Sequence, residues 1–308
     1  MRFVKMHGIG NDYIYIDAFT EPSVESATDL PRLSQLVAER HTGIGADGLI
    51  ALCRPKQAGH VRMRMFNADG SESEMCGNGI RCVAKFAHDR LGLRHRPMLV
   101  ETGRGLLSID YEASRSGGRE VLTRATVNMG VPVLDAERIP VAPPRPSPDG
   151  QVVGMALSGR IDLPDGGSWR AACGLVDSMT CVSMGNPHVV MFCDDLARVP
   201  LESVGPIIER HPIFPKRVNA HFVRVVSPRE AIMRTWERGS GITMACGTGA
   251  CAALVAGVLT KRLDREALIH LPGGDLTLAW KAEGVFKTGP AADVCEGDWL
   301  GDPCRVDR

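Results

Sequence analysis

The sequence predicts an α/β (α+β) protein of two pseudo-symmetric domains, each a curled mixed β-sheet around a central helix. The first observation is a repeated turn, because "EMCGNGIRC" at 74–82 returns as "MACGTGACA" at 244–252, 170 residues later. The second is that other segments repeat around it in the same order. The third is a globular composition, with 44% apolar and 23% charged residues in a chain of 308, which is long enough for two domains.

The repeat extends beyond the two turns. "AERH" at 38–41 returns as "IERH" at 208–211, and each is expected to end a helix. "GNDYIYI" and "GNPHVVM" each place a strand-like apolar run after Gly-Asn, and Phe66-Asn67 precedes Cys76 as Trp236-Glu237 precedes Cys246. Four matches in the same order indicate two copies of one α/β unit.

The helices that follow the two turns predict how each unit is built. "IRCVAKFAHDRLG" is amphipathic, whereas "ACAALVAGVLTKR" is small and apolar nearly all round. A helix without a polar face must be buried on all sides, and a sheet curled round it satisfies that requirement.

The segments between the copies predict the domain boundaries. The stretch 128–150 is rich in proline and is interpreted as a crossover, 160–172 as an irregular loop or hairpin, and 113–120 as a hairpin turn. We therefore expect one domain of residues 1–127 plus 290–308, which carries Cys76, and a second of residues 128–289, which carries Cys246.

The composition also excludes several classes of protein. Lysine and arginine together equal aspartate and glutamate, 36 each, so the chain is not expected to bind nucleic acid or an anionic membrane. The first residues lack an apolar signal core and no run approaches the length of a membrane span, so we expect a soluble cytoplasmic protein.

The ten cysteines are expected to be reduced thiols, and no spacing among them suggests a metal site. We interpret most of them as core packing: Cys53, Cys82, Cys173, Cys181, Cys193, Cys251 and Cys304. The string "GIGADG" at 43–48 matches the dinucleotide-binding pattern, but it follows a helix-like run and precedes a strand-like one, so we interpret it as a turn.

Two cysteines at two helix starts suit one chemistry. The free N–H groups of a helix start stabilise a thiolate, which predicts a lowered thiol pKa for Cys76 and Cys246, and the neighbouring glycines leave room for a carboxylate. If the two turns face each other, one thiolate can remove a proton from a carbon next to a carboxylate while the other thiol returns one to the opposite face. The pattern therefore predicts inversion of a carbon centre by two cysteines.

At these residues the sequence resembles diaminopimelate epimerase. The resemblance spans nearly the whole chain, through "KMHGIGNDYIYID", "FNADGSESEMCGNGIRC", "SMGNPHVV", "WERGSGITMACGTGACA", "LPGGDL" and "TGPAADV". It implies a diaminopimelate epimerase-like fold and a cofactor-independent enzyme that interconverts LL- and meso-2,6-diaminopimelate, in lysine biosynthesis and the supply of a cell-wall precursor. It also implies a homodimer.

The resemblance assigns roles residue by residue. Cys76 is implied to act on the LL isomer and Cys246 on the meso isomer, and His188 and Glu237 are implied to tune the pKa of the thiols. Arg238 suits a bidentate grip on the distal carboxylate of the substrate. The full set of implied substrate contacts is Asn11, Asn67, Gly77, Asn78, Asn186, Asn219, Glu237, Arg238, Gly247 and Thr248.

Four positions depart from the family pattern. Gly48 stands where some members have a substrate-contacting Gln, and Ile242 and Met244 stand where polar residues are frequent. Cys295 replaces a Tyr that serves dimerisation in some members. The first three bear on substrate contacts and the last on the dimer, and none of them alters the two thiols.

Two other functions remain open at this point. One is a racemase of the same fold that acts on proline, hydroxyproline or histidine; the grip on a distal charged end by Asn67, Asn186, Asn219 and Arg238 argues against it. The other is a thiol-based binding or redox protein, which would be expected to carry a nearby resolving cysteine in a C-x-x-C pattern, and the sequence has none.

Overall fold

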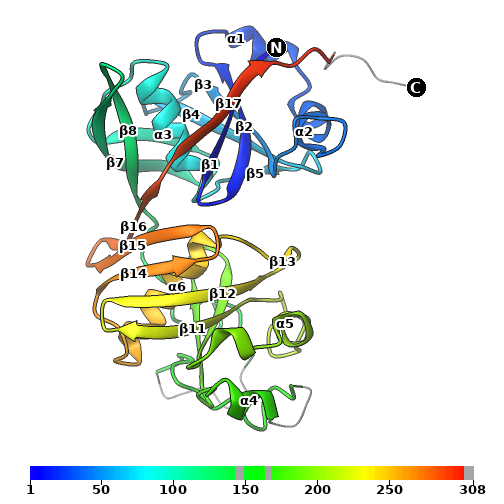
Figure 1. The fold of residues 1–308 in the computed structure, drawn as a ribbon, viewed down its shortest axis with the longest axis vertical. Coiled ribbons are helices and arrows are strands. Elements are labelled where there is room, and N and C mark those ends of the chain that lie inside the picture. The colour runs from blue at the N-terminus through cyan, green and yellow to red at the C-terminus, as the bar shows by residue number, and fades with distance from the viewer. Residues whose placement is uncertain (143–148, 164–167, 302–308) are drawn as a thin grey trace. The chain divides into compact units, whose positions relative to one another are not determined.

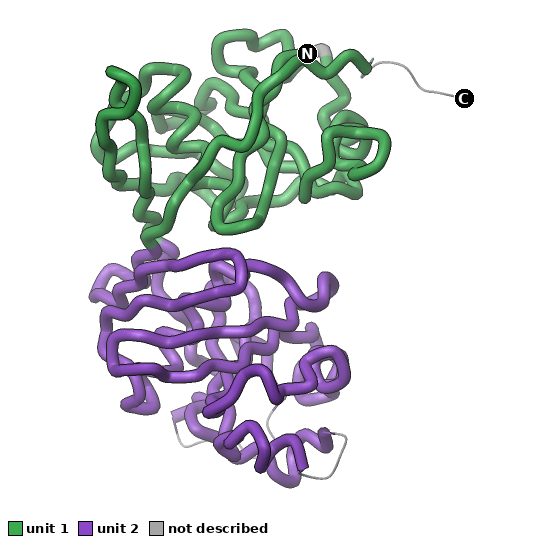
Figure 2. The backbone as a smooth tube through the Cα atoms, viewed as in Figure 1, with its two compact units in different colours: residues 1–128, 288–308 green, residues 129–287 purple. Residues whose placement is uncertain are grey.

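The computed structural model describes residues 1–142, 149–163 and 168–301. The chain divides into two compact units (Figure 2). Unit 1 comprises Met1–Asn128 and Thr288–Arg308, and unit 2 comprises Met129–Lys287.

Unit 1 is a mixed sheet with the strand order β17-β1-β2-β3-β4-β6-β7-β8, in which β5 pairs with β4 (Figure 1). The pairs β2/β3 and β4/β6 are parallel and the others are antiparallel. The strands are β1 (Arg2–Gly8), β2 (Asn11–Ala18), β3 (Gly48–Cys53), β4 (Val61–Asn67), β5 (Glu72–Ser73), β6 (Met98–Thr102), β7 (Gly105–Ser116), β8 (Arg119–Asn128) and β17 (Ala292–Asp298). The helices are α1 (Pro22–Ala27), α2 (Leu30–Ala38) and α3 (Gly79–Asp89).

Unit 2 has the order β9-β10-β11-β12-β14-β15-β16, in which β13 pairs with β12. The pairs β10/β11 and β12/β14 are parallel. The strands are β9 (Met179–Ser183), β10 (Pro187–Phe192), β11 (Asn219–Ser227), β12 (Glu230–Glu237), β13 (Gly241–Ile242), β14 (Glu266–Leu271), β15 (Gly274–Lys281) and β16 (Gly284–Pro290). The helices are α4 (Ser168–Ala172), the short 3-10 helix η1 (Leu196–Arg198), α5 (Leu201–Glu209) and α6 (Gly247–Leu259).

The two units repeat each other element by element. Strands β1 to β8 with α2 and α3 correspond in order and direction to β9 to β16 with α5 and α6. Strand β17, which returns to pair with β1, is an addition in unit 1. This correspondence confirms the internal repeat and the fold class predicted from the two Cys-Gly turns.

Each unit curls its sheet round one central helix. Helix α3 contacts β1 to β4 and also β8, and α6 contacts β9 to β11 and also β14 and β15. Both helices are therefore covered by strands from distant places in the sheet order. The apolar α6 is buried as predicted, and the amphipathic α3 is buried as well.

The polar side chains of α3 form hydrogen bonds and ion pairs inside the protein. The Arg81 guanidinium donates to the Asn78 side chain and to the carbonyl of Pro290, and the Lys85 ammonium pairs with Asp89 at 2.6 Å. Buried charges are tolerated when they are paired and hydrogen-bonded in this way. The amphipathic pattern of α3 thus marks a buried polar network and not a solvent face.

Other local predictions have mixed outcomes. The hairpin at 113–120 is confirmed, because β7 and β8 are joined through Gly117 and Gly118, which have φ angles of 57° and 78°. The stretch 160–172 is not simply a loop or hairpin, since Ser168–Ala172 forms α4, whose buried Trp169 packs edge-on against Phe222; residues 164–167 lie outside the described residues. Helix α2 ends at Ala38, before the Glu-Arg-His run.

The cysteines expected in the core are buried where the structure describes them, namely Cys53, Cys82, Cys173, Cys181, Cys193 and Cys251. Cys304 lies outside the described residues, and Cys295 is exposed on β17. The "GIGADG" segment forms the connection between α2 and β3, as expected for a turn. No helix in the described ranges combines the length and the apolar character that a membrane span requires.

Candidate active site

Cys76 lies in the turn that starts α3. Its carbonyl accepts the Ile80 N–H, and its sulfur accepts the Gly79 N–H at 3.3 Å. Its thiol donates to the Asn11 Oδ1 at 3.2 Å. The Asn11 amide nitrogen donates in turn to Asp47 at 2.6 Å, which turns the amide oxygen toward the thiol. Cys76 is half-buried and sits in a polar setting.

Two further groups of unit 1 belong to this environment. Tyr13 is buried, and burial together with the Cys76 charge raises the pKa of its phenol well above the ordinary value. Burial and the neighbouring Asp12 raise the pKa of Asp47, while the Arg40 guanidinium lies 3.0 Å from the Asp47 carboxylate. Tyr13 was not among the site residues predicted from the sequence, although a period of two places it on the same strand face as Asn11.

Cys246 occupies the N-cap position of α6 and is only 2% exposed. Its carbonyl accepts the Ala250 N–H, and its sulfur lies 3.8 Å from the Thr248 hydroxyl. Burial, followed by the Glu237 carboxylate, raises the pKa of the Cys246 thiol far above its ordinary value, against the opposing effects of the Gly249 N–H and Thr248. The predicted lowering of the thiol pKa is therefore wrong for Cys246, because desolvation outweighs the helix start.

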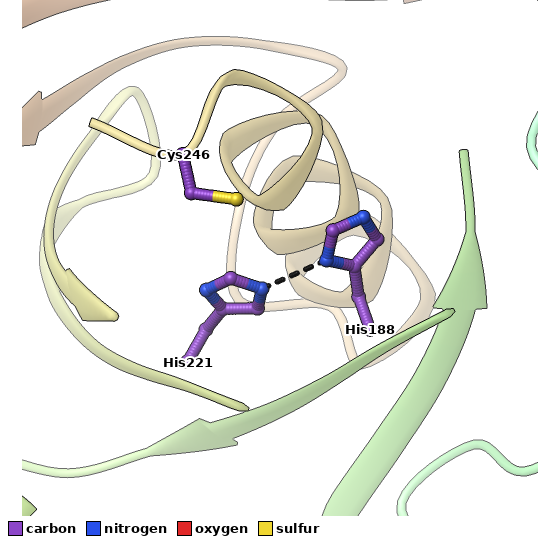
Figure 3. A group of neighbouring side chains, drawn as sticks. All are labelled: His188, His221 and Cys246. Atoms are coloured by element: carbon purple, nitrogen blue, oxygen red, sulfur yellow. Dashed lines mark hydrogen bonds between the residues drawn. The ribbon is translucent and has the colours of Figure 1, made fainter. Parts of the chain in front are cut away.

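Two buried histidines, His188 and His221, lie beside Cys246 (Figure 3) and form part of a hydrogen-bond chain. The His188 Nδ1 and His221 Nε2 are 2.9 Å apart, and the His221 Nδ1 lies 2.9 Å from the Thr235 hydroxyl. The His188 Nε2 contacts the Asn186 Oδ1 at 2.9 Å. Burial lowers the pKa of His221 to about 3, and burial together with His221 lowers the pKa of His188 well below its ordinary value. Both imidazoles are therefore neutral at physiological pH.

The same three side chains could in principle bind a metal ion. His188, His221 and Cys246 offer ligand atoms that all lie within 4.8 Å of one another, and they are the one such group in the part of the chain that the structure describes. However, all four ring nitrogens are already engaged with each other, with Asn186 or with Thr235. Coordination would have to break these hydrogen bonds, so the arrangement favours an acid–base cluster over a metal centre.

The remaining predicted residues of unit 2 lie at the ends of β11 and β12. The buried Asn219 donates to the Pro187 carbonyl and accepts the Arg238 N–H, so its amide nitrogen and its amide oxygen both bind main-chain groups. The exposed Arg238 side chain donates to the Lys216 carbonyl. The Glu237 carboxylate accepts the Thr243 hydroxyl at 2.9 Å.

The remaining predicted residues of unit 1 lie near its Cys-Gly turn or at the end of β4. Asn78 is buried at the N-cap of α3 and follows the half-buried Gly77. The Asn67 amide donates to the Ser71 hydroxyl at 2.9 Å. Unit 1 thus brings together Cys76, Gly77, Asn78 and Asn11, just as unit 2 brings together Cys246, Gly247, Thr248, Asn186 and His188.

The sequence of the chain matches one family of known proteins. The family model described as diaminopimelate epimerase matches residues 3–134 and 180–294. The chain belongs to the diaminopimelate epimerase family. It is 47% identical over 298 residues to the diaminopimelate epimerase of Geobacillus thermodenitrificans, covering 96% of this chain and 95% of the relative. It is 46% identical over 301 residues to that of Moorella thermoacetica, covering 97% and 99%.

Solved structures share the fold of the diaminopimelate epimerase family at low sequence identity. A phenazine biosynthesis protein of Bacillus anthracis superposes with a TM-score of 0.65 at 16% identity, over 97% of this chain and 99% of that one. A probable proline racemase from Agrobacterium radiobacter superposes with a TM-score of 0.62 at 12% identity, over 99% and 94%. These likenesses show the fold alone.

The departures from the diaminopimelate epimerase pattern have clear structural settings. A Cβ at Gly48 would lie 2.1 Å from the Phe66 carbonyl oxygen, so this backbone leaves no room for a side chain there. Ile242 and Met244 are 44% and 54% exposed beside the second Cys-Gly turn. One residue missed by sequence analysis is His221, whose position on β11 two residues after Asn219 was the available signal.

Proposed function

We propose that the chain interconverts LL-2,6-diaminopimelate and meso-2,6-diaminopimelate without a cofactor, as a step of lysine biosynthesis that also supplies a cell-wall precursor. The observation that carries the proposal is the pair of equivalent turns, each of which places one cysteine at the start of a buried central helix. Membership of the diaminopimelate epimerase family supports it.

Cys76 and Cys246 act in this proposal as the two proton-exchanging groups. A thiolate takes the proton from the α-carbon on one face, the electron pair is held on the carbon and its carboxylate, and the other thiol donates its proton to the opposite face. Cys76 serves the LL isomer and Cys246 the meso isomer. After one turnover the two sulfurs have exchanged their protonation states, which is the starting arrangement for the reverse direction.

The surroundings of the two sulfurs suit these roles. The raised pKa of Cys246 keeps its thiol protonated, so Cys246 is the acid when LL-diaminopimelate is the substrate. The Gly79 N–H that faces the Cys76 sulfur would stabilise a thiolate there. The carboxylate next to the reacting carbon is bound by N–H groups at Gly77-Asn78 and Gly247-Thr248, because a helix start directs backbone N–H groups and a partial positive charge toward an anion.

The other end of the substrate is held by the remaining predicted contacts. Arg238 is exposed and long enough to pair with a distal carboxylate, and Asn67 and Asn186 carry amides for its polar groups. Glu237 acts through its charge on the Cys246 thiol. This grip requires a substrate with a second charged end, so alanine and proline should not be racemised.

The proposal also includes a cytoplasmic homodimer. Free thiols are typical of a reducing compartment, and the structure has free cysteines throughout both units. Strand β17 exposes Val294 and Cys295, a surface suited to pairing with a second copy. Light scattering of the purified protein tests the dimer.

The test of the activity is incubation of the purified chain with LL-diaminopimelate in deuterated water, followed by NMR. We expect meso-diaminopimelate with deuterium at the inverted α-carbon. Cys295→Ser, which alters an exposed thiol outside both turns, is the matched control and should remain active once light scattering shows that its oligomeric state equals that of the wild type. Absence of both inversion and exchange, in protein shown to be folded, would refute the proposed function.

A further inference from the structure

The polar layer beside Cys246, which contains His221 and Thr235, has an apolar counterpart in unit 1. Strand β4 corresponds to β12, so Met65 occupies the place of Thr235. In the antiparallel pairs, Met65 lies opposite Ile50 and Thr235 lies opposite His221. Ile50 is therefore the equivalent of His221.

The contacts with the central helices confirm this equivalence. A Cβ built on Gly79 would lie 2.7 Å from the Ile50 Cδ1, and one built on Gly249 would lie 2.2 Å from the His221 Cε1. Both glycines are the last residue of the Cys-Gly-x-Gly turn. Isoleucine and histidine thus pack at the same place under the same turn.

The difference shows that the fold itself does not need the histidine. Unit 1 builds the same layer with Ile50 and Met65, and such apolar side chains pack without any hydrogen-bonding requirement. A buried imidazole is tolerated only when its nitrogens are satisfied, as those of His221 are by His188 and Thr235. The polar layer therefore has a reason beyond packing.

With the Asn186 Oδ1 facing His188 and both rings neutral, the hydrogen-bond chain has one consistent set of proton positions. The Asn186 Oδ1 is an acceptor, so the His188 Nε2 must donate to it. Neutral His188 then has a bare Nδ1, which accepts from the His221 Nε2–H. Neutral His221 has a bare Nδ1, which accepts from the Thr235 hydroxyl. Each tautomer is fixed by the next group along the chain.

The hydrogen-bond chain ends at the amide of Asn186. Its oxygen is occupied by His188, and among the described residues its nitrogen donates to no protein group. In unit 1, by contrast, the equivalent Asn11 donates an amide N–H to Asp47 and directs its oxygen to Cys76. The two asparagines are thus oriented by different partners, and only Asn186 has both N–H groups left for a ligand.

We propose that His221 is a positioning residue that, through His188, holds the Asn186 amide so that its NH2 group donates to a carboxylate of the substrate. The inference rests on the proposed function, in which Asn186 contacts the non-reacting end of diaminopimelate. Without the His221 donor, His188 can take the other tautomer and the amide can turn its oxygen toward the substrate, where it would repel a carboxylate.

The first test reads the tautomers directly in the wild-type chain. Nitrogen-15 labelling of the histidines, with the His221→Gln spectrum to assign the signals, shows which ring nitrogen carries the proton. We expect His188 and His221 to be neutral and protonated at Nε2 near neutral pH. A Nδ1-protonated or doubly protonated ring at either residue would overturn the proposal. This test needs no turnover, so its outcome is independent of whether the proposed activity is found.

The second test separates KM from kcat. His221→Leu removes the donor, and because the lost contact binds ground state and transition state alike, we expect KM to rise about tenfold with kcat changed less than threefold. His221→Gln can place an amide N–H near the Nε2 position and should restore KM. If His221 served packing alone, His221→Gln would have no lower KM than His221→Leu. Equal KM values for the two variants would therefore overturn the proposal.

A variant at Thr235, the other end of the hydrogen-bond chain, covers the case in which His221→Leu fails to fold. Thr235→Val removes the hydroxyl that fixes the His221 tautomer, whereas Thr235→Ser keeps it. We expect a rise in KM of about threefold for Thr235→Val and none for Thr235→Ser. An unchanged KM in Thr235→Val, with the nitrogen-15 signals of His188 also unchanged, would show that the chain does not orient Asn186.

Discussion

The two cysteines occupy equivalent places in two copies of one fold, but their surroundings differ. Cys76 is half-buried and contacts the Asn11 amide and the Gly79 N–H. Cys246 is almost fully buried beside two neutral imidazoles. The difference shows that the repeated backbone supplies the position of each thiol, whereas the burial and the charged neighbours of each thiol set its protonation.

The largest expected effect is on activity. Cys76→Ala and Cys246→Ala each remove one proton-exchanging group, and we expect each to lower the rate of epimerisation by a thousandfold or more, as general acid–base groups do at the upper end of their range. Circular dichroism of both variants controls for folding. If either folded variant kept full activity, the two thiols would not be equivalent members of one catalytic pair.

The second expected effect is a difference in acid sensitivity between the units. The pKa values of His188 and His221 are lowered in the folded chain. As the pH falls below about 6.5, these histidines therefore take up protons in the unfolded chain before they do so in the folded chain. The stability that the two neutral rings contribute above this pH is lost as the pH falls toward their folded pKa values. For His221, whose folded pKa is about 3, the free energy of unfolding of unit 2 falls by about 2 kcal/mol between pH 7 and pH 5, and His188 changes it in the same direction.

Hydrogen exchange of peptides from each unit, measured along a urea gradient at both pH values, tests this prediction. Unit 1 has Ile50 in place of His221 and Tyr13 in place of His188, so its urea midpoint should fall less. His221→Gln removes this titrating ring and should reduce the acid effect in unit 2 by about 2 kcal/mol. An equal fall in the two units would contradict the prediction.

The repeat and the two thiols could be predicted from the sequence because both depend on local patterns. The Cys-Gly turns, the Gly-Asn strand starts and the apolar α6 are each visible within a dozen residues. Ser168–Ala172 became a helix because Trp169 packs against the distant Phe222, a contact that the local sequence does not reveal. The resemblance to diaminopimelate epimerases added the substrate contacts.

The chemistry of the thiols could not be predicted in the same way. A helix start lowers a thiol pKa, and this local rule failed for Cys246 because the opposing burial comes from strands, distant in the sequence, that pack round α6. His221 was missed for the same reason. It reaches Cys246 and His188 only once β10 and β11 pair in parallel.

The third expected effect is on thiol reactivity. Alkylation by iodoacetamide requires an accessible thiolate, and Cys246 is buried with a raised pKa while Cys76 is half-exposed. We expect Cys76 to react at least tenfold faster in the absence of substrate, as measured by mass spectrometry of the two peptides. Cys53 and Cys82, whose pKa values burial raises to about 12 and about 11, serve as unreactive internal controls. Comparable rates for Cys76 and Cys246 would mean that the two environments are alike in solution.

The smallest expected effect concerns the glycine that closes each turn. An Ala at position 249 places its Cβ 2.2 Å from the His221 Cε1, and the ring is held by hydrogen bonds at both nitrogens, so it cannot move aside freely. An Ala at position 79 meets the Ile50 Cδ1 at 2.7 Å, and that methyl group can rotate away. We therefore expect Gly249→Ala to lower the free energy of unfolding by about 1–3 kcal/mol and Gly79→Ala by less than about 1 kcal/mol.

A double-mutant cycle identifies the cause of that difference. His221→Ala removes the ring that the new methyl group would strike, so Gly249→Ala should be much less destabilising in the His221→Ala background than in the wild type, by a coupling energy of about 1 kcal/mol or more. Urea denaturation of the four proteins gives the coupling. Additive effects would mean that the strain lies in the α6 backbone, and the equivalence drawn between Ile50 and His221 would then rest on strand register alone.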